Sequence, residues 1–326
     1  MIELKDNELK FKFPNIHSKA GCNIDFQRTL RIPDDNNEYP LPPGLGKFPL
    51  HHVDDYAKNL PNKWKKHGGV FLPMYQSEAL WISFKGSYPC AVKVAAGKIN
   101  AVSGQHWSNS LTEKPQDYVV SSEQQWLDGF NVSEGYIRQF VAMPLGEGFT
   151  AEEQITNKAE IGGLQIIVYP MKESFYQEFF RIGIASHMNF QILQPILKDN
   201  ELGFAPGGLM RQSIEEDDYG IDAWDQENGS RCFIHLLNSD EYKIITGNKP
   251  PHQAPSSQDY TDAGMPWFEY YSDKKSLPGS DVLGKLTSVA AKSVEKGDGP
   301  LEKNHSVTLG NIKIIKKSNI VRDGEF

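Results

Sequence analysis

The sequence of 326 residues is poor in cysteine and lacks the long apolar runs of a membrane protein. Its three cysteines, Cys22, Cys90 and Cys232, are far apart and odd in number, so they predict neither a disulfide framework nor a Cys-x-x-Cys pair. No run approaches the ~18 apolar residues that cross a bilayer. The first residues, MIELKDNELKFKF, also lack the apolar centre of a secretory signal. We therefore expect a soluble, cytoplasmic protein without membrane association.

An excess of positive charge is also missing. The chain has 34 basic and 42 acidic residues, a net charge of −8, which repels a phosphate backbone. One short basic run, Lys63–His67, places a tryptophan among cations as single-strand binders do. A solvated helix end is the more ordinary interpretation of such a run. Nucleic acid is therefore an unlikely partner.

Familiar catalytic motifs are absent: there is no G-x-S-x-G elbow, no Walker A sequence and no zinc-ligand spacing. The nearest match is G-x-G-x-x-A at residues 146–151, which follows a predicted strand as a dinucleotide fingerprint does. However, glutamates surround this loop, and Thr150 with Glu153 forms a capping box that would satisfy the backbone amides. We predict a self-capped loop and no bound cofactor.

Strand-forming segments dominate the remainder. With 39% apolar and 23% charged residues, the chain is typical of a globular protein with a large core. We predict a mainly β, α+β fold: an antiparallel β-sandwich or barrel-like core with a few short helices. Strands are expected at 23–32, at 70–102 as a meander with one wet face, at 136–143 and 164–169 as a hairpin-like unit, at 231–238 and at 311–317. Short helices are expected at 53–60, from Phe175 onwards and near 283–291.

The composition changes after Gly247, where Pro, Ser, Gly and Asp become frequent. We predict a β-rich core domain at 1–245 and an extended C-terminal segment at 246–326, packed on the core as one integral unit. An aromatic cluster ends the proline-rich stretch and is expected either to anchor this segment or to contact a partner. The cluster consists of Trp267, Phe268, Tyr270 and Tyr271.

Seven acidic residues lie between positions 215 and 227, and hard cations such as Ca²⁺ take several oxygens from one loop. The spacing does not match an EF-hand. A solvated acidic turn pinned by Tyr219 and Trp224 is the alternative. The candidate metal ligands here are Asp217 and Asp218, and the candidate catalytic carboxylates are Asp222 and Asp225.

Histidines supply the other candidate groups. His235 lies in the middle of a predicted strand, where it could serve as a ligand or a catalytic base, although a hydrogen-bonded core histidine is commoner. Cys232 in the same strand is interpreted as a small buried hydrophobe. A second group of metal-type ligands contains His51, His52, Asp54 and Asp55.

Several segments together resemble a known group of sequences. They are PQDYVVSSEQQWLDGF, YIRQFVAMPLGEGFTAEEQ, GGLQIIVYP, DDYGIDAWDQ and SRCFIHLLN, and the likeness extends from FPLHHVDDYA to YTDAGMPWFEYY. The chain is similar in these segments to a family of soluble hypothetical proteins with no assigned activity. The resemblance implies that the chain is one integral unit, and it implies no functional residues.

Taken together, these patterns predict a non-catalytic binding or assembly protein. Its partner would be another protein or a second copy, bound through the aromatic cluster or an exposed sheet edge. The alternative is a metal-assisted hydrolase or carbohydrate-active enzyme that uses the acidic turn with His51 or His52 and His235. A divalent metal is expected only under this alternative.

Overall fold

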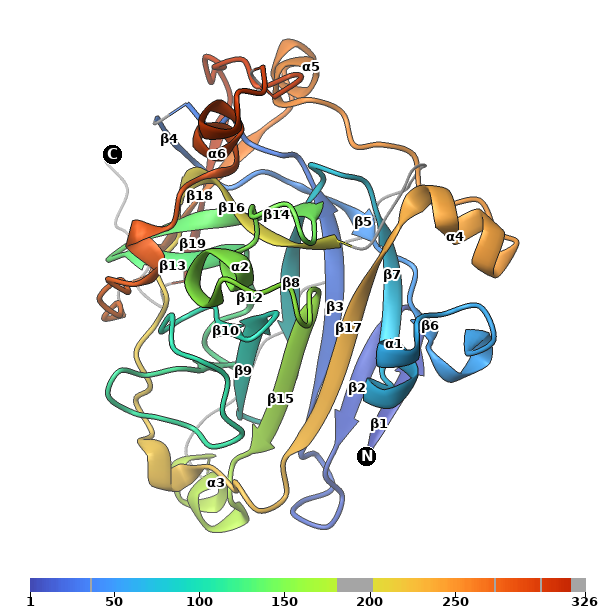
Figure 1. The fold of residues 1–326 in the computed structure, drawn as a ribbon. Coiled ribbons are helices and arrows are strands. Elements are labelled where there is room, and N and C mark those ends of the chain that lie inside the picture. The colour runs from blue at the N-terminus through green and yellow to red at the C-terminus, as the bar shows by residue number, and fades with distance from the viewer. Residues whose placement is uncertain (36, 181–201, 273, 300, 318–326) are drawn as a thin grey trace, which may run out of the picture.

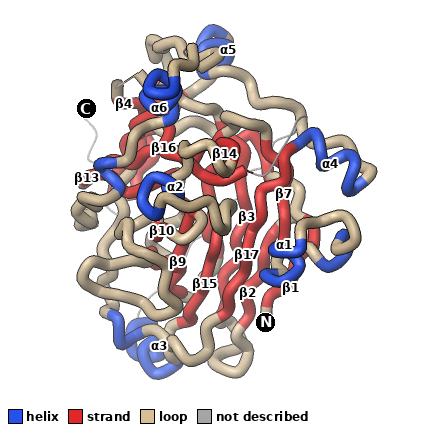
Figure 2. Tube along the Cα trace, viewed as in Figure 1, coloured by secondary structure: helices blue, strands red, loops and turns tan. Residues whose placement is uncertain are grey.

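The computed structural model describes all residues except 36, 181–201, 273, 300 and 318–326. Two large β-sheets lie face to face, and short helices cover their outside (Figures 1 and 2). Neither sheet closes on itself among the described strands, so the sandwich is the observed form. The predicted mainly β, α+β class is thereby confirmed. None of the described helices is long and apolar enough to cross a membrane.

The first sheet has ten strands, and its pairs are antiparallel except for β16 with β4. Its main path is β1 (Ile2–Lys5), β2 (Glu8–Lys12), β3 (Gly21–Thr29), β8 (Ala79–Lys85), β14 (Tyr136–Pro144), β16 (Leu202–Arg211) and β4 (Glu38–Tyr39). Three strands pair beside this path: β5 (Gly44–Lys47) with β3, β12 (Trp126–Leu127) with β8, and β13 (Gly129–Ser133) with β14.

The second sheet has seven strands and is also mixed, since β17 and β7 are parallel. Its path is β10 (Ile99–Asn100), β9 (Cys90–Ala96), β15 (Leu164–Pro170), β17 (Ser230–Asn238), β7 (Val70–Met74) and β6 (His51–His52), with β11 (Val119–Val120) beside β9. A separate parallel pair joins β18 (Trp267–Ser272) to β19 (Ile312–Lys317). The helices are α1 (Asn62–His67), α2 (Ala151–Thr156), α3 (Glu173–Phe180), α4 (Ser239–Thr246), α5 (Ser257–Asp262) and α6 (Val289–Lys296), with 3₁₀ turns η1 (Asp54–Tyr56), η2 (Ile221–Ala223) and η3 (Leu283–Lys285).

The two sheets share one hydrophobic core. Phe26 and Ile82 of the first sheet are fully buried in the same cluster as Val94 and Ile166 of the second. Because the inner faces of the two layers contact each other along alternate residues, this packing explains the period-two pattern of the strands.

Two predicted strand pairings are wrong. In the 70–102 region, β7 and β9 belong to the second sheet and β8 to the first, so consecutive strands change layers instead of forming a meander. Likewise β14 and β15 lie in different sheets, and α2 connects the layers rather than capping a hairpin-like unit. Alternation of apolar residues places a strand in a two-faced sheet, but it does not identify the neighbouring strand.

The predicted wet face of residues 90–102 is also wrong at Lys93, whose side chain is 0% exposed. The loop at residues 103–118 folds over this face of β9. The Nζ of Lys93 lies 2.5 Å from Oδ2 of Asp117. It also donates to Oγ of Ser108 at 3.0 Å and to the carbonyl of Ser110 at 2.6 Å. The alternation of lysine with apolar residues is the same in the sequence whether a loop covers the lysine or water surrounds it.

The helix predictions were correct in part. The segment at 53–60 forms only the 3₁₀ turn η1. The helix expected from Phe175 onwards is observed as α3, and residues 181–201 lie outside the described part of the chain. The helix expected near 283–291 is divided into η3 and α6. The division occurs because Ser288 is extended and caps α6, accepting a hydrogen bond from the Ala291 N–H.

The C-terminal segment, residues 246–317 as described, crosses the core at several points. Gly279 passes so close to β13 that an added Cβ would lie 2.0 Å from the Cα of Ser133, which leaves room only for glycine. Asp34 exchanges hydrogen bonds with Asn304, and its carboxylate accepts one from the Ala290 N–H at the start of α6. The proline-rich stretch is interrupted by α5, where Ser256 and Asp259 form a capping box.

Candidate functional site

A groove of about 730 Å³ lies between the core and the C-terminal segment. Its core side is formed by the turn between β7 and β8 and by the end of β14. Its other side is formed by residues 253–256, 293–299 and 301–303. We call this space the C-terminal groove. A volume in this range is typical of small-molecule sites.

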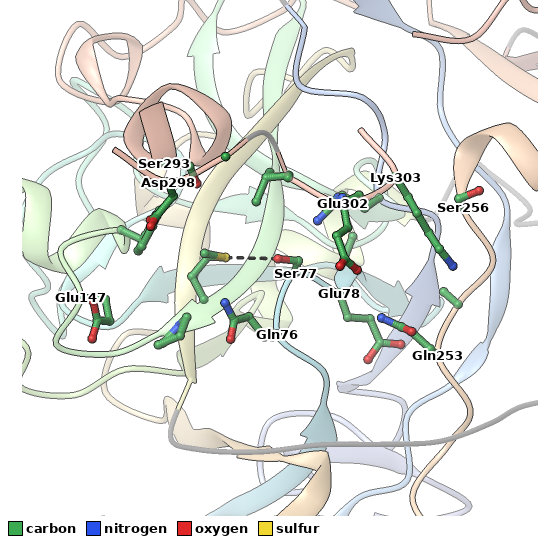
Figure 3. A pocket seen from close by; sticks show the side chains of 18 of the residues that line it. Gln76, Ser77, Glu78, Glu147, Gln253, Ser256, Ser293, Asp298, Glu302 and Lys303 are labelled. Atoms are coloured by element: carbon green, nitrogen blue, oxygen red, sulfur yellow. Dashed lines mark hydrogen bonds between the residues drawn. The ribbon is translucent and has the colours of Figure 1, made fainter. Parts of the chain in front are cut away.

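Polar side chains dominate the lining of the groove. Gln76, Ser77 and Glu78 project from the turn, with Glu147 on one side of them and Gln253 on the other (Figure 3). Further amide, hydroxyl and charged groups come from the C-terminal segment, and apolar side chains such as Met143, Phe149 and Leu301 complete the lining. The groove therefore offers many hydrogen-bond donors and acceptors beside a comparable extent of apolar surface.

The most buried ionisable group of the lining is Glu78, which forms an ion pair with Arg28 of β3. The Nε and Nη2 atoms of Arg28 donate to Oε1 of Glu78 at 3.1 and 2.9 Å, and the two side chains are only 3% and 2% exposed. Burial raises the pKa of the Glu78 carboxyl despite the guanidinium charge. The other carboxylate oxygen accepts a bond from the Tyr75 N–H at 3.0 Å.

Arg28 and the neighbouring Tyr75 also bind the C-terminal segment. Nη2 of Arg28 donates to the carbonyl of His252, and the hydroxyl of Tyr75 donates to the carbonyl of Pro251 at 3.0 Å. Glu78 is thus committed to positioning one wall of the groove. It is not a free acid or base.

Three cationic side chains line the groove. Lys296 is paired, since its Nζ lies 2.6 Å from Oε2 of Glu147. Arg31 donates to the carbonyl of Glu302 but forms no ion pair with the described residues, and desolvation lowers the pKa of its guanidinium. Lys303 is exposed and makes no hydrogen bond or ion pair within the described chain. The charges of Asp34 and Glu302 also act on Arg31. Lys303, and Arg31 in competition with these two carboxylates, can meet a negative group on a ligand.

The predicted self-capping of the 146–151 loop is confirmed. Oε1 of Glu153 accepts hydrogen bonds from the N–H groups of Gly146 and Gly148 at 2.8 and 2.9 Å. Oε2 accepts from the N–H and the hydroxyl of Thr150 at 3.2 and 2.7 Å. The Oγ1 of Thr150 in turn accepts from the Glu153 N–H at 3.2 Å, which completes the capping box. The carboxylate of the protein thus occupies the position where a phosphate would bind in a dinucleotide loop.

His235 lies on the outer face of the second sheet, under α1. Its side chain stacks on Trp64 with ring centroids 4.6 Å apart, and its Nε2 lies 3.0 Å from the carbonyl of Gly68. Because a carbonyl only accepts, Nε2 carries the proton. Desolvation lowers the pKa of His235 to about 4. The geometry is that of a neutral, hydrogen-bonded core histidine.

We expect His235 to make the stability of the protein pH-dependent. Its pKa is about 4 in the folded chain, below the ordinary histidine value of 6.5, so the unfolded chain binds the proton more readily. The stabilisation is complete above pH 6.5 and is lost as the pH falls from 6.5 to 4, by about 3 kcal/mol in total. Urea unfolding across this range should show a weaker pH dependence in His235→Gln than in the wild type. Equal dependence in both proteins would contradict the assignment.

His51 and His235 both lie opposite Phe71 of β7, one on each neighbouring strand, so the Phe71 position separates the two histidines. The Nε2 of His51 lies 2.6 Å from the Tyr242 hydroxyl, and burial lowers the pKa of His51. His52 is exposed on β6, and Asp54 and Asp55 lie exposed on η1. Cys232, in β17, is buried, which raises the pKa of its thiol to about 12.

The acidic turn is held by its own hydrogen bonds. Asp217 accepts from the Tyr118 hydroxyl at 2.6 Å and from Nε1 of Trp224 at 2.8 Å. Of the remaining candidates, Asp218 forms an ion pair with Lys274. Asp222 is exposed in η2, and Asp225 accepts a hydrogen bond from the Asn228 N–H. Within the described residues, no group of three or more His, Cys, Asp or Glu side chains could hold a metal ion.

The aromatic cluster lies on β18. Trp267 is fully buried, and the N–H and carbonyl of Phe268 bond to Leu41 of the core. Tyr270 contacts the edge of Trp126 with ring centroids 4.8 Å apart, and Tyr271 occupies the next position of the strand. Trp267 therefore serves as an anchor for the C-terminal segment.

Comparison of the chain with protein-family models, with curated proteins and with solved structures found no match. The groove was not among the sites suggested by sequence patterns, because its two sides are about 200 residues apart in the chain. One local signal was present: the β-forming 23–32 segment contains the charged residues Asp25, Arg28 and Arg31, of which Arg28 reaches Glu78 and Arg31 lines the groove.

Proposed function

We propose that the protein is a non-catalytic binding protein that holds a small hydrophilic ligand in the C-terminal groove. The observation that supports this is the combination of a groove of about 730 Å³ with a polar lining whose most buried carboxylate, Glu78, is already neutralised by Arg28. A lining of this kind binds and orients a ligand through hydrogen bonds but offers no activated acid, base or nucleophile.

The lining also limits the chemistry of the ligand. The amides of Gln76 and Gln253 donate and accept, and the carboxylates of Asp298 and Glu302 accept from hydroxyl groups. Arg31 and Lys303 suit a carboxylate, because charge-assisted hydrogen bonds are stronger than neutral ones. A small hydroxyl-rich acid, such as a sugar acid, combines these groups.

Calorimetric titration with glucuronate, with glucose and with acetate tests this proposal. We expect glucuronate to bind most tightly, and we expect Arg31→Gln and Lys303→Met each to weaken its binding about tenfold or more, because a hydrogen bond to a charged group contributes about 1.5–3 kcal/mol. Lys114→Met, which removes an exposed lysine outside the groove, is the control.

Two results would contradict the proposal. One is the absence of binding by all three compounds to a folded protein. The other is glucuronate binding that neither groove substitution changes. Unfolding midpoints of the variants, measured alongside, show whether a loss of binding reflects a loss of fold.

A further inference from the structure

Strand β19 is the outer strand of the two-stranded β18–β19 sheet, which lies beside the larger sheet. Phe268 of β18 exchanges backbone hydrogen bonds of 2.8 and 2.9 Å with Leu41, which follows β4 by two residues. This isolated bridge joins the β18–β19 pair to the chain just after β4, next to the ten-stranded sheet. Among the described strands, β19 pairs only with β18, so its other edge is open.

The open edge presents backbone groups that can bind a strand. The carbonyl of Asn311 accepts a hydrogen bond from the Trp267 N–H, and it therefore points toward β18. Because alternate residues of a parallel strand bond to the same neighbour, the N–H and carbonyl groups of Ile312 and Ile314 point away from β18. Such unpaired groups are a template for another strand.

Isoleucine side chains along this strand are unusually exposed. Ile312 is 44% exposed, Ile314 62% and Ile315 42%. Alternation places Ile312 and Ile314 on one face of the strand and Ile315 on the other. Natural edge strands are normally protected by charge, proline or a covering element, and isoleucine is usually buried. An added strand would cover apolar surface on both faces.

Charge distinguishes between the partners that could supply this strand. Strand β19 contains three lysines and no acidic residue, although the whole chain has a net charge of −8. A second copy of β19 would bring the same positive charge to the edge. An acidic strand would instead complement it. A lipid surface would leave the outward backbone groups of Ile312 and Ile314 without hydrogen-bond partners.

We infer that β19 is a docking edge for an extended acidic segment of a partner protein, in which Asp or Glu alternates with β-branched apolar residues. The partner segment adds one strand to the sheet, and its backbone bonds to Ile312 and Ile314. This interaction is separate from ligand binding in the C-terminal groove and goes beyond it.

Fluorescence anisotropy with a labelled octapeptide of alternating valine and glutamate tests the inference. We expect saturable binding that weakens at least tenfold, about 1.4 kcal/mol, when alternate peptide amides are N-methylated or when lysine replaces glutamate. Ile314→Asp should abolish binding. Ile314→Thr, which keeps a β-branched residue, should weaken it, and Ile244→Asp, at an exposed isoleucine of α4, should leave it unchanged.

Other outcomes would overturn the inference. These are no binding at millimolar peptide, equal binding of the N-methylated peptide, or equal binding to Ile314→Asp. Sedimentation that shows a wild-type dimer lost in Ile314→Asp would assign the edge to a second copy. Binding of the wild type to phosphatidylserine vesicles in preference to the acidic peptide would assign it to a membrane surface.

Discussion

Replacing Glu78 with glutamine is expected to lower the free energy of unfolding by about 3–5 kcal/mol. The substitution keeps the shape of the side chain but removes its charge, which leaves the Arg28 guanidinium buried beside a neutral amide. Arg28 is almost inaccessible to water, with its side chain 3% exposed. An unpaired buried charge cannot recover its hydration without disrupting the packing of β3 and β8.

Replacing Arg28 instead of Glu78 should lower the free energy of unfolding by a smaller amount. In Arg28→Met the remaining carboxyl can take up a proton, because burial already raises the pKa of Glu78. The double variant Arg28→Met/Glu78→Leu should lie closer to the wild type than Glu78→Gln does, since it leaves no buried charge. Arg211→Met is the control, because Arg211 forms exposed ion pairs with Glu38 and Glu269 that contribute less than about 1 kcal/mol.

The pair at Arg28 should also influence the C-terminal groove. Arg28 donates to the carbonyl of His252, next to Gln253 of the groove wall. We expect protease cleavage near residues 250–256 to be faster in Glu78→Gln than in the wild type or in Arg211→Met. Chemical denaturation together with timed proteolysis measures both effects. A Glu78→Gln protein as stable as Arg211→Met would show that the pair does not contribute as inferred.

Local features of the structure could be predicted from the sequence because they depend on neighbouring residues. The strands expected at 136–143 and 164–169 are observed at Tyr136–Pro144 and Leu164–Pro170. The capping box at Thr150 and Glu153 was predicted because the two residues are one helical turn apart and need no distant partner.

Long-range features could not be predicted in the same way. Whether β14 pairs with β15 or with β16 depends on which layer each strand joins, and both choices have the same alternation of residues. The groove depends on the meeting of the β7–β8 turn with residues 293–303, and no sequence spacing connects them. His235 illustrates the same limit, because its stacking on Trp64 comes from a helix about 170 residues earlier.

Lys93 is a charged residue that a loop covers, and its replacement should cause the second large loss of stability. Asp117 and Lys93 form an ion pair of 2.5 Å with side-chain exposures of 3% and 0%. Oδ1 of Asp117 also accepts a hydrogen bond from the Thr112 N–H at 2.9 Å, so the pair joins β9 to the covering loop. The ring of Trp107 lies 5.6 Å from the Nζ of Lys93 and belongs to the same loop.

We expect Lys93→Met to lower the free energy of unfolding by about 3–5 kcal/mol, because Asp117 is left buried without its counter-charge. Lys93→Met/Asp117→Leu should recover part of this loss. Lys98→Met, in the same region, removes an exposed ion pair with Glu160 and should cost less than about 1 kcal/mol. Denaturant unfolding gives the energies, and hydrogen exchange of residues 103–118 shows whether the loop opens. If Lys93→Met and Lys98→Met have equal effects and exchange in the loop is unchanged, the pair does not hold the loop against the sheet.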